Sequence, residues 1–532
     1  MRSTFASGEA AASIVIVGGL LGMEWRTPVI SPGFEDAMNA WDQLTSRIHE
    51  LDAIGGAMAL LDWDQQTYLP AGAGASRGKQ AAALGRIYHE RFTAPEVGSW
   101  LDSLEGSSLD RVQTSAVRNA RRRYRRATVL PGRLVEELSH ARTAGFAAWM
   151  KAREANDFAP YAAPLQRLID LTREQAERQA TPGQHLYDAL LEDYDPGSTI
   201  AELRPMFERL GRELNRFLDA IQGRPPAEGF DAPLDIEGQR KLSERVLTDL
   251  GFDRVHGRLD LSEHPFSVGL ATDDVRITTH FRVDNFLAAL GGTVHECGHA
   301  MYEQGLPSQW AGTGLDKAAG MGLHESQSRF WENFIGRSEA FCRYLAPRMH
   351  GIWPTLAVTP TSLYAAMNKV DRSLIRIFAD EATYNLHVLV RFEIEVAVLE
   401  GKLQAVDLPA AWDDAYRRIV GVVPPTAKEG VLQDVHWSGG AFGYFPSYTI
   451  GNLYAAGFGA KIQEDLPDIW ERVERGDFKA ILAWLRDHVH AKGHLDDAPV
   501  LFREVVGDRD PVEDLVAHLW NRHGRLYGVE RS

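Results

Sequence analysis

A histidine pair with a glutamate beside it is the part of the chain whose spacing most directly suggests chemistry. His295, Glu296 and His299 form an H-E-x-x-H pattern. On a helix, histidines four residues apart project from one face about one turn apart, so both imidazoles can hold a single ion. Glu296 lies next to that face, where a carboxylate can act as a general base on water without being a ligand. The pattern therefore predicts two thirds of a hydrolytic zinc site.

The helix that must carry this pattern is expected to begin after Asp284, a plausible N-cap, and to end at Gly305 and Pro307. Gly291 and Gly292 weaken it and would let another backbone approach closely. One face is apolar at helical spacing, with Phe286, Leu287, Leu290, Val294, Cys297 and Met301. Because Cys297 belongs to this apolar face, we expect a buried small side chain there rather than a metal ligand.

A third metal ligand is expected downstream, because two histidines alone hold zinc poorly. The nearest candidates are Glu303, His324, Glu325 and Glu332. Glu303 lies one turn beyond His299 on the same helix. We expect it to orient a metal ligand through a hydrogen bond without binding the metal itself. A second helix over residues 323–333 would offer Glu325 and complete a His2Glu set. Local geometry does not decide whether Glu325 or the adjacent His324 is the ligand, since neighbours on a helix point about 100° apart and only one of them can face the metal.

Six motifs in the chain resemble those of the carboxypeptidase Taq family of zinc metallocarboxypeptidases, in the order found in that family. They are His264-Pro265-Phe266, the D-x-R-x-T stretch 274–278, the H-E-x-x-H pattern, the H-E-S-Q-S stretch 324–328, the I-R-x-x-A-D stretch 375–380, and the G-x-x-Q-D-x-H-W stretch 430–437. The resemblance extends from roughly residue 38 to the C-terminus. It implies a mainly α-helical zincin with a deep central groove and one small β-sheet beside the active site.

The resemblance also implies an activity and a set of roles. Glu325 would be the third ligand of Zn²⁺, with Co²⁺ as an alternative metal, and Arg376 would bind the free C-terminal carboxylate of a peptide substrate. Single residues would be removed from peptide C-termini with broad specificity, by an enzyme that commonly forms homodimers. Two other functions stay open: an oligopeptidase or dipeptidase with the same zinc chemistry, and a catalytically silent helical scaffold. For Arg376 itself, the alternative is an ordinary i,i+4 ion pair with Asp380.

The segment 433–452 is rich in glycine and aromatic residues, a composition that suits the wall of a pocket. By analogy with distantly related helical zincins, a histidine followed about ten residues later by a tyrosine would stabilise an oxyanion. His436 fits this role. Tyr444 and Tyr448 fall on either side of the expected spacing, and we select Tyr448 as the tyrosine that would stabilise the oxyanion. The alternative is that His436 is a packed, hydrogen-bonded core residue.

One stretch has the character of a β-strand. Residues 275–281 alternate and are rich in β-branched side chains, which predicts a strand at the edge of a small sheet leading into the zinc helix. An edge strand beside the groove could pair with an extended peptide. Arg276 would then be either a substrate contact or a structural partner of Asp274.

Composition excludes several classes of function. The chain of 532 residues has 57 Lys plus Arg against 73 Asp plus Glu, a net charge of −16, which argues against nucleic acid or an anionic membrane as a partner. The basic run 118–126 is expected to spread around the exposed face of a helix and to pair with acidic side chains rather than to bind nucleic acid. Only two cysteines, Cys297 and Cys342, are present, which suits a reducing compartment such as the cytoplasm.

The domain organisation is expected to be simple. Residues 1–33 lie before the part of the chain that resembles the family. They are predicted to be a disordered extension, or the start codon is assigned too early and the true start is Met23 or Met38. Residues 34–532 are expected to form one catalytic domain of two helical lobes, without a transmembrane segment. Apolar spacing predicts helices over 41–63, 79–92, 165–180, 200–218, 236–250 and 374–399.

Overall fold

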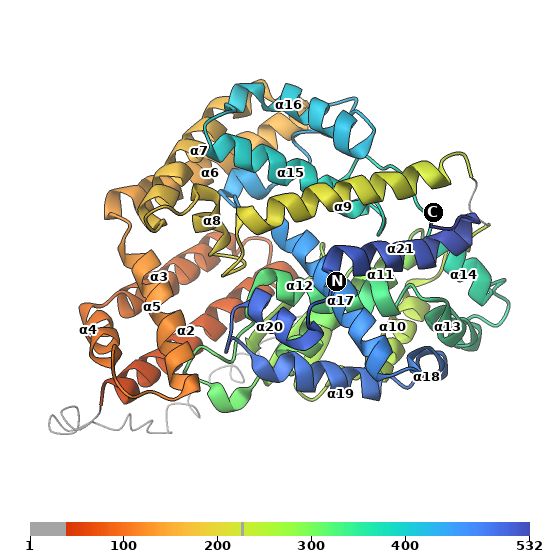
Figure 1. Cartoon of the computed structure of the whole chain (residues 1–532), viewed down its shortest axis with the longest axis horizontal. Helices are drawn as coiled ribbons and strands as arrows, with labels where there is room; N and C mark the ends of the chain where they lie inside the picture. Colours follow the sequence, from red (N-terminus) through yellow and green to blue (C-terminus); the bar gives the residue numbers. More distant parts are fainter. Residues whose placement is uncertain (1–38, 225–227, 532) are drawn as a thin grey trace, which may run out of the picture.

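The computed structural model of the chain describes residues 39–224 and 228–531. The predicted extension, residues 1–33, and both alternative starts, Met23 and Met38, lie outside these ranges. The described chain is mainly helical with one small sheet, as predicted (Figure 1).

The first part of the chain is helical up to the sheet. It contains α2 (Ala40–Thr67), α3 (Gly74–Phe92), α4 (Pro95–Leu104), α5 (Arg111–Thr128), α6 (Gly132–Ala155), α7 (Ala159–Gln179), α8 (Leu186–Leu191), α9 (Ile200–Ile221) and α10 (Ile236–Leu250). The sheet and the helices after it are β1 (Gly257–Leu261), β2 (Ser267–Ala271), β3 (Asp274–Thr279), α11 (Phe286–Glu303), α12 (Met321–Arg329), a π-helix (Phe330–Ile335), α13 (Glu339–Ile352), α14 (Pro360–Met367) and α15 (Tyr384–Leu399). The chain ends with α16 (Leu408–Ala415), α17 (Pro446–Asp465), α18 (Ile469–Arg475), α19 (Lys479–His488), α20 (Ala498–Val506) and α21 (Pro511–Tyr527).

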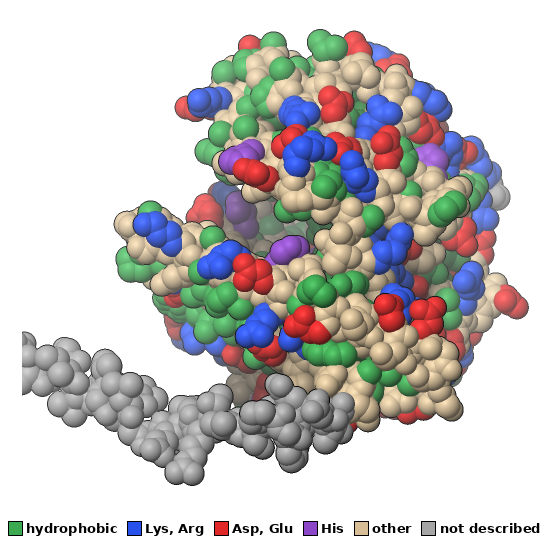
Figure 2. Space-filling view, turned by 90° about the vertical axis from the view of Figure 1, so that its left-hand side faces the viewer, with side chains coloured by type: hydrophobic (Ala, Val, Ile, Leu, Met, Phe, Trp, Pro, Cys, Tyr) green, Lys and Arg blue, Asp and Glu red, His purple; other side chains and the backbone are tan. Residues whose placement is uncertain are grey.

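Two helical parts face each other across a hollow. In Figure 1, α6, α7, α15 and α16 lie at the top, whereas α10, α13, α18 and α19 lie at the bottom. Figure 2 shows that the face seen from the left of Figure 1 is deeply hollowed between an upper and a lower part, with histidine side chains in the hollow. Helices α11 and α12 pack together near the middle, and α12 packs along α17. None of the described helices is both long and apolar enough to cross a membrane.

The small sheet corrects one prediction. Its strand order is β1-β3-β2, with β1 parallel and β2 antiparallel to β3. The strand predicted at an edge, β3, is therefore central, and both of its sides are already hydrogen-bonded. An extended peptide cannot add to β3, because its backbone donors and acceptors are used within the sheet.

Helix α11 begins one residue later than predicted. Its N-cap is Asn285, whose side chain accepts a hydrogen bond from the Ala288 backbone at 3.3 Å, whereas Asp284 pairs with Arg282. Cys297 is fully buried and free, as predicted.

The glycine that allows close backbone approach is Gly298, inside the H-E-x-x-H pattern, rather than Gly291 or Gly292. A Cβ at Gly298 would lie 2.6 Å from the Gln327 carbonyl oxygen and 2.6 Å from the Ser328 Cα. At Gly291 the nearest atom lies at 4.0 Å, and at Gly292 it lies at 3.6 Å. Of these three glycines, only Gly298 is required for α11 and α12 to cross so closely.

Gly298→Ala is therefore expected to destabilise the protein, by about 1–3 kcal/mol, because α11 and α12 must separate to admit the methyl group. Gly291→Ala is the matched control on the same helix, expected to stabilise by up to about 1 kcal/mol since alanine favours a helix. Urea unfolding of the two variants and of the parent measures both effects. Equal stabilities for the two variants would contradict this account of the helix crossing.

The stretch 374–399 is not one helix. A short 3₁₀ helix spans Arg376–Phe378, and α15 starts only at Tyr384. Between them the Asp380 carboxylate accepts hydrogen bonds from the backbone of Asp371, Ala382 and Thr383, which holds the chain in a loop. Asp380 is thus a loop residue and not a helical partner of Arg376.

The basic run lies on α5 and pairs with acidic residues, as predicted. Arg121 binds Asp102 at 2.8 Å, and Arg122 binds Asp497 at 2.9 Å. Arg126 departs from the predicted exposed face, because it is buried and binds Asp193 at 2.6 Å. These arginines connect α5 to neighbouring segments of an acidic protein.

Candidate metal centre and active site

Three side chains predicted as ligands come together at the crossing of α11 and α12. His295 and His299 of α11 and Glu325 of α12 each offer an atom, and these atoms lie within 4.8 Å of one another. Glu325 Oε2 is 3.7 Å from His295 Nε2 and 3.4 Å from His299 Nε2. A tetrahedral zinc ion with ligands at about 2.0–2.1 Å needs donor atoms separated by roughly 3.3–3.5 Å. The two separations from Glu325 Oε2 are close to this range, so the three side chains could together hold a divalent metal ion. Within residues 39–224 and 228–531, this is the one such group of three.

The second nitrogen of each histidine is already bound. Nδ1 of His295 lies 2.8 Å from Glu332 Oε2, and Nδ1 of His299 lies 3.1 Å from the His324 carbonyl oxygen. Donation from Nδ1 leaves the Nε2 lone pair free for a metal. Glu332, one of the candidate ligands from the sequence, thus lies behind His295 rather than in the cluster.

His324, the alternative to Glu325, lies outside the cluster. Its ring stacks on His299, with centroids 4.4 Å apart, and its Nε2 lies 2.8 Å from Glu303 Oε1. The sequence had suggested that Glu303 orients a metal ligand. Glu303 instead contacts His324, which is not one of the three clustered side chains.

Arg329, which had not been selected from the sequence, joins two acidic side chains, Glu325 of α12 and Glu332 of the π-helix that follows it. Its Nε donates to Glu325 Oε1 at 2.7 Å, and its Nη1 donates to Glu332 Oε2 at 3.0 Å. Burial alone would raise the pKa of Glu332, but Arg329 and His295 outweigh it and lower this pKa to about 2. The spacings of Arg329 from Glu325 (i,i+4) and from Glu332 (i,i+3) on one helix were the signal available in the sequence.

Glu296, the predicted general base, is nearly buried at 8% exposure. Burial raises its pKa to about 7, and His295 partly opposes this shift. A carboxyl group with a pKa near neutrality can both accept and return a proton, which is the property required of a general acid and base.

Arg376, predicted to bind the substrate, lies in a second group of side chains, of which Asp434 and Tyr384 had not been selected from the sequence. Its guanidinium is buried, with Nη2 and Nε at 2.8 and 3.1 Å from Asp434 Oδ1 and Nη1 donating to the Tyr384 hydroxyl at 2.9 Å. The alternative pair with Asp380 is absent, because Arg376 lies outside α15. Asp434 is held in turn by Arg391, at 2.6 Å from its Oδ2.

His436 and the two tyrosines lie beside Arg376. The His436 ring centroid is 5.4 Å from Tyr444 and 6.4 Å from Tyr448, whose ring lies 4.9 Å from the Arg376 guanidinium. Burial lowers the pKa of His436 to about 4, so its imidazole is neutral at neutral pH. The segment is more than a pocket wall, since Trp437, Phe442 and Phe445 are buried in the core.

The two groups are joined through Tyr384. The Arg329 guanidinium lies over the Tyr384 ring at 4.5 Å, and the Tyr384 hydroxyl accepts from Arg376. The residues predicted for metal binding and for substrate binding are therefore neighbours, although they lie far apart in sequence.

Arg276 has the structural partner that the sequence allowed. It binds Asp274 through two hydrogen bonds of 2.8 Å, and its guanidinium lies over the Trp63 ring at 4.4 Å. Its position on the central strand β3 removes the edge-strand argument for a substrate contact.

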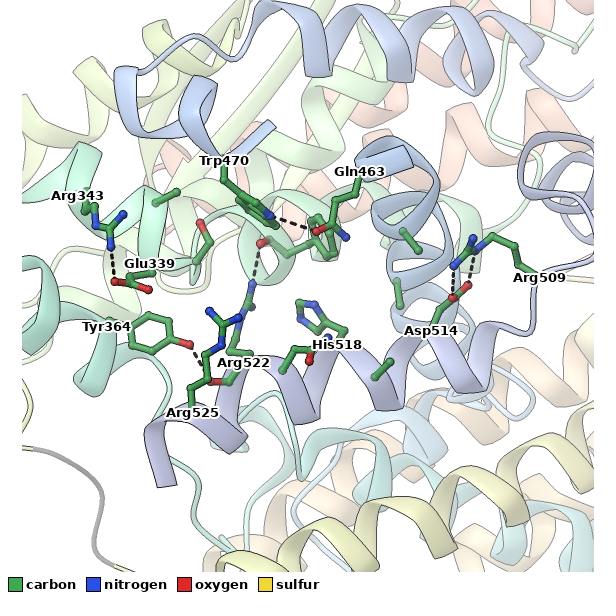
Figure 3. Close-up of a pocket in the computed structure, with 17 residues that line it drawn as sticks. Glu339, Arg343, Tyr364, Gln463, Trp470, Arg509, Asp514, His518, Arg522 and Arg525 are labelled. Atoms are coloured by element: carbon green, nitrogen blue, oxygen red, sulfur yellow. Dashed lines mark hydrogen bonds and ion pairs between the residues drawn. The ribbon is translucent and has the colours of Figure 1, made fainter. Parts of the chain in front are cut away.

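A separate pocket of about 590 Å³ lies between α13, α17, α18 and α21 (Figure 3). Two of its arginines are paired within its walls: Arg343 with Glu339 and Arg509 with Asp514. Its lining contains none of the residues predicted to hold a metal or a substrate.

The segment that carries His436 is anchored by a buried carboxylate with a shifted pKa. Glu395 of α15 accepts hydrogen bonds from Trp437 Nε1 and the Tyr187 hydroxyl, both at 2.7 Å, and from the Gly443 backbone at 3.0 Å. Burial nevertheless raises the pKa of Glu395 to about 7.

This shift predicts a pH dependence of stability. Between pH about 4.3 and 7 the folded state holds the Glu395 proton more tightly than the unfolded chain, so this group's contribution to stability falls as pH rises, by at most about 4 kcal/mol. Glu395→Gln should remove this part of the pH dependence, whereas Glu393→Gln, an exposed neighbour on α15, should not. Urea unfolding at pH 5, 6, 7 and 8 tests this, and parallel curves for Glu395→Gln and the parent would contradict it.

The fold and the site define a class of protein. A mainly helical chain in which an H-E-x-x-H helix meets a glutamate from the next helix is the arrangement of helical H-E-x-x-H metallopeptidases.

Comparison with known proteins identifies the family within this class. The chain belongs to the carboxypeptidase Taq (M32) metallopeptidase family, whose model matches residues 43–523. It is 42% identical to thermostable carboxypeptidase 1 of Thermus thermophilus over 505 residues, covering 92% of this chain and 99% of that protein. It is 34% identical to carboxypeptidase 1 of Bacillus subtilis over 478 residues, covering 88% of this chain and 95% of that protein.

Solved structures agree with this assignment. The crystal structure of the M32 carboxypeptidase from Deinococcus radiodurans R1 superposes with a TM-score of 0.89 and 38% identity, over 92% of this chain and 100% of that one. The chain is therefore a peptide hydrolase of the metallocarboxypeptidase type.

Proposed function

We propose that the protein removes single residues from the C-termini of peptides, with Zn²⁺ held by His295, His299 and Glu325 and with Co²⁺ as an alternative metal. The observation that carries this proposal is the convergence of three donor atoms within 4.8 Å of one another, with Glu325 Oε2 at 3.7 and 3.4 Å from the Nε2 atoms of His295 and His299. Membership of a metallocarboxypeptidase family supports the same reading.

In the proposed mechanism, bound zinc supplies Lewis acidity for the scissile carbonyl and lowers the pKa of water. Glu296 accepts a proton from the attacking water and delivers it to the leaving amine. His436 and Tyr448, or Tyr444 in its place, donate hydrogen bonds to the developing oxyanion, a role typically worth about 2.7–4 kcal/mol per donor.

Arg376 is proposed to bind the substrate's C-terminal carboxylate. Its pairing with Asp434 fixes the guanidinium, while its Nη1 donates only to the hydroxyl of Tyr384. A carboxylate can replace that neutral acceptor and form a charge-assisted hydrogen bond. Arg276 remains a second proposed contact, with its pairing to Asp274 as the structural alternative.

Mass spectrometry of an N-terminally blocked peptide incubated with the zinc-loaded protein tests the proposal. Sequential loss of single C-terminal residues is the expected result. Internal cuts would instead assign the protein as an oligopeptidase and remove the proposed role of Arg376. The absence of any cleavage would indicate a silent scaffold.

Three further properties belong to the same proposal. Specificity for the C-terminal residue is proposed to be broad, the protein is proposed to act in the cytoplasm, and two copies are proposed to form a homodimer. A peptide library that varies only the last residue, cell fractionation, and light scattering of the purified protein test them in turn.

A further inference from the structure

The cavity of about 590 Å³ in Figure 3, which we call the α21 pocket, has charged walls and an apolar floor. Its apolar lining consists of Phe334, Ala340, Ala456, Ala460, Trp470 and Ala517. Arg343, Asn521 and Arg525 also line it and are exposed, so the pocket is open to solvent on their side. Its volume falls within the range of about 300–1,000 Å³ that is typical of sites for small organic molecules.

The acidic side chains of this lining already have positive partners. Glu339 binds Arg343 at 2.5 Å, and Asp514 binds Arg509 at 2.7 Å. Arg525, in contrast, makes neither a hydrogen bond nor an ion pair with any side chain in the described part of the chain, although it lines the same pocket. The pocket therefore has an unpaired positive charge and no unpaired negative one.

The charge of Arg525 acts inside the pocket. Burial raises the pKa of Tyr364, which also lines the pocket, and the positive charges of Arg522 and Arg525 oppose this shift. A guanidinium without a carboxylate partner keeps its N–H donors for water or for a ligand. Arg525 is thus free to bind an anion that enters the pocket.

Two further polar atoms of α21 are open to the pocket. Arg522 donates through Nη1 to Glu381 at 3.1 Å and through Nη2 to the Phe334 carbonyl at 2.7 Å, but its Nε has no partner within the described residues. His518 contacts Glu381 through Nε2 at 2.9 Å, and its Nδ1 likewise has no partner in that part of the chain. Neither Arg522 Nε nor His518 Nδ1 is fully enclosed by protein, so a molecule in the pocket can reach both atoms.

These three side chains come from one face of α21, because residues 518, 522 and 525 are spaced at i, i+4 and i+7 (Figure 3). Glu381 can only accept, so Nε2 of His518 carries the proton and Nδ1 is an acceptor in the neutral imidazole. Burial lowers the pKa of His518, which keeps the ring neutral at pH 7. The face therefore offers two positive donors, Arg522 Nε and Arg525, and one acceptor, His518 Nδ1.

A phosphate monoester matches this set of groups better than a carboxylate does. Near neutral pH it carries between one and two negative charges, and its oxygens can accept from both arginines. Its singly charged form also keeps a P–O–H group that can donate to His518 Nδ1, which an ionised carboxylate cannot do. The space beyond the phosphate is large and apolar enough for the organic part of the ester, with Trp470 as a contact for a ring.

We propose that the α21 pocket binds a small organic phosphate monoester, whose phosphate accepts hydrogen bonds from Arg525 and Arg522 Nε and donates one to His518 Nδ1. The organic part of the ester lies against Trp470 and the apolar floor. This inference does not depend on the proposed peptidase activity, since no residue of the metal cluster lines the α21 pocket.

Calorimetric titration of phenyl phosphate, inorganic phosphate and benzoate into the zinc-loaded protein, at one pH and one ionic strength, tests the proposal. Phenyl phosphate is expected to bind most tightly, because inorganic phosphate lacks the organic part and benzoate lacks the phosphate. Arg525→Gln should weaken the binding of phenyl phosphate by about tenfold, as expected for a lost charge-assisted hydrogen bond. Arg503→Gln removes an exposed arginine outside the pocket and should leave the dissociation constant unchanged.

The other outcomes separate the site from its alternatives. An unchanged dissociation constant for Arg525→Gln would overturn the site, because phosphate bound elsewhere, such as at the metal, would not need this arginine. Asn521→Asp adds a negative charge at the exposed rim, one turn from Arg525, and should also weaken binding; no effect would count against the site. Benzoate binding as tight as that of phenyl phosphate would overturn the choice of phosphate as the ligand. A parent protein that shortens peptides but does not bind phenyl phosphate would overturn this inference and leave the proposed function intact.

Discussion

Replacing Glu296 by glutamine is expected to lower kcat by about 10²–10⁴-fold while the bound metal is retained. Glutamine has nearly the same shape and can neither accept nor return the proton. Glu296 is not one of the three clustered donors, so the affinity for zinc should change little. Peptide turnover and metal content measured on the same zinc-loaded sample test both parts.

Glu303→Gln is the matched control on α11. It removes a carboxylate from the same helix whose contact is with His324 rather than with a clustered donor. We expect a much smaller loss of kcat for this variant. Loss of zinc from Glu296→Gln, or turnover near the parent's rate, would show that Glu296 has a role other than that of general base.

Replacing Arg329 by glutamine is expected to weaken zinc binding by about 10–100-fold, an effect typical of residues that orient metal ligands. Arg329 holds Oε1 of Glu325, which leaves Oε2 directed at His295 and His299, and it also holds Glu332 against His295. Without the arginine, two buried carboxylates would lose their shared positive partner. Titration of the metal-free protein against a competing chelator measures the affinity directly.

Arg337→Gln is the control for Arg329. Arg337 also reaches Glu332, at 3.2 Å from Oε1, but does not contact Glu325. It should weaken zinc binding less than Arg329→Gln does, and Arg329→Lys should fall between the glutamine variant and the parent because it keeps the charge but loses the fork geometry. Equal affinities for Arg329→Gln and Arg337→Gln would show that Glu325 does not depend on the arginine. Unfolding curves of the metal-free variants distinguish a lost ligand geometry from a lost fold.

The sequence by itself determined the features that depend on local periodicity. His295 and His299 lie on one face of a helix because they are four residues apart, and α10 spans the residues that apolar spacing predicts. Composition likewise predicted that the arginines of α5 pair with acids. The order of six motifs was specific enough to identify the family, which the comparison then confirmed.

Only the tertiary structure decided which groups meet across elements. Glu325 and Glu332 lie two helical turns apart, yet the crossing of α12 over α11 places one in the cluster and the other behind His295. That crossing depends on Gly298, whose neighbours come from another helix. Arg376 meets Asp434, 58 residues away, rather than Asp380, and β3 is central because two other strands pair with it. The physical reason is that periodicity fixes the direction of a side chain relative to its own helix or strand, whereas packing between elements fixes what that side chain contacts.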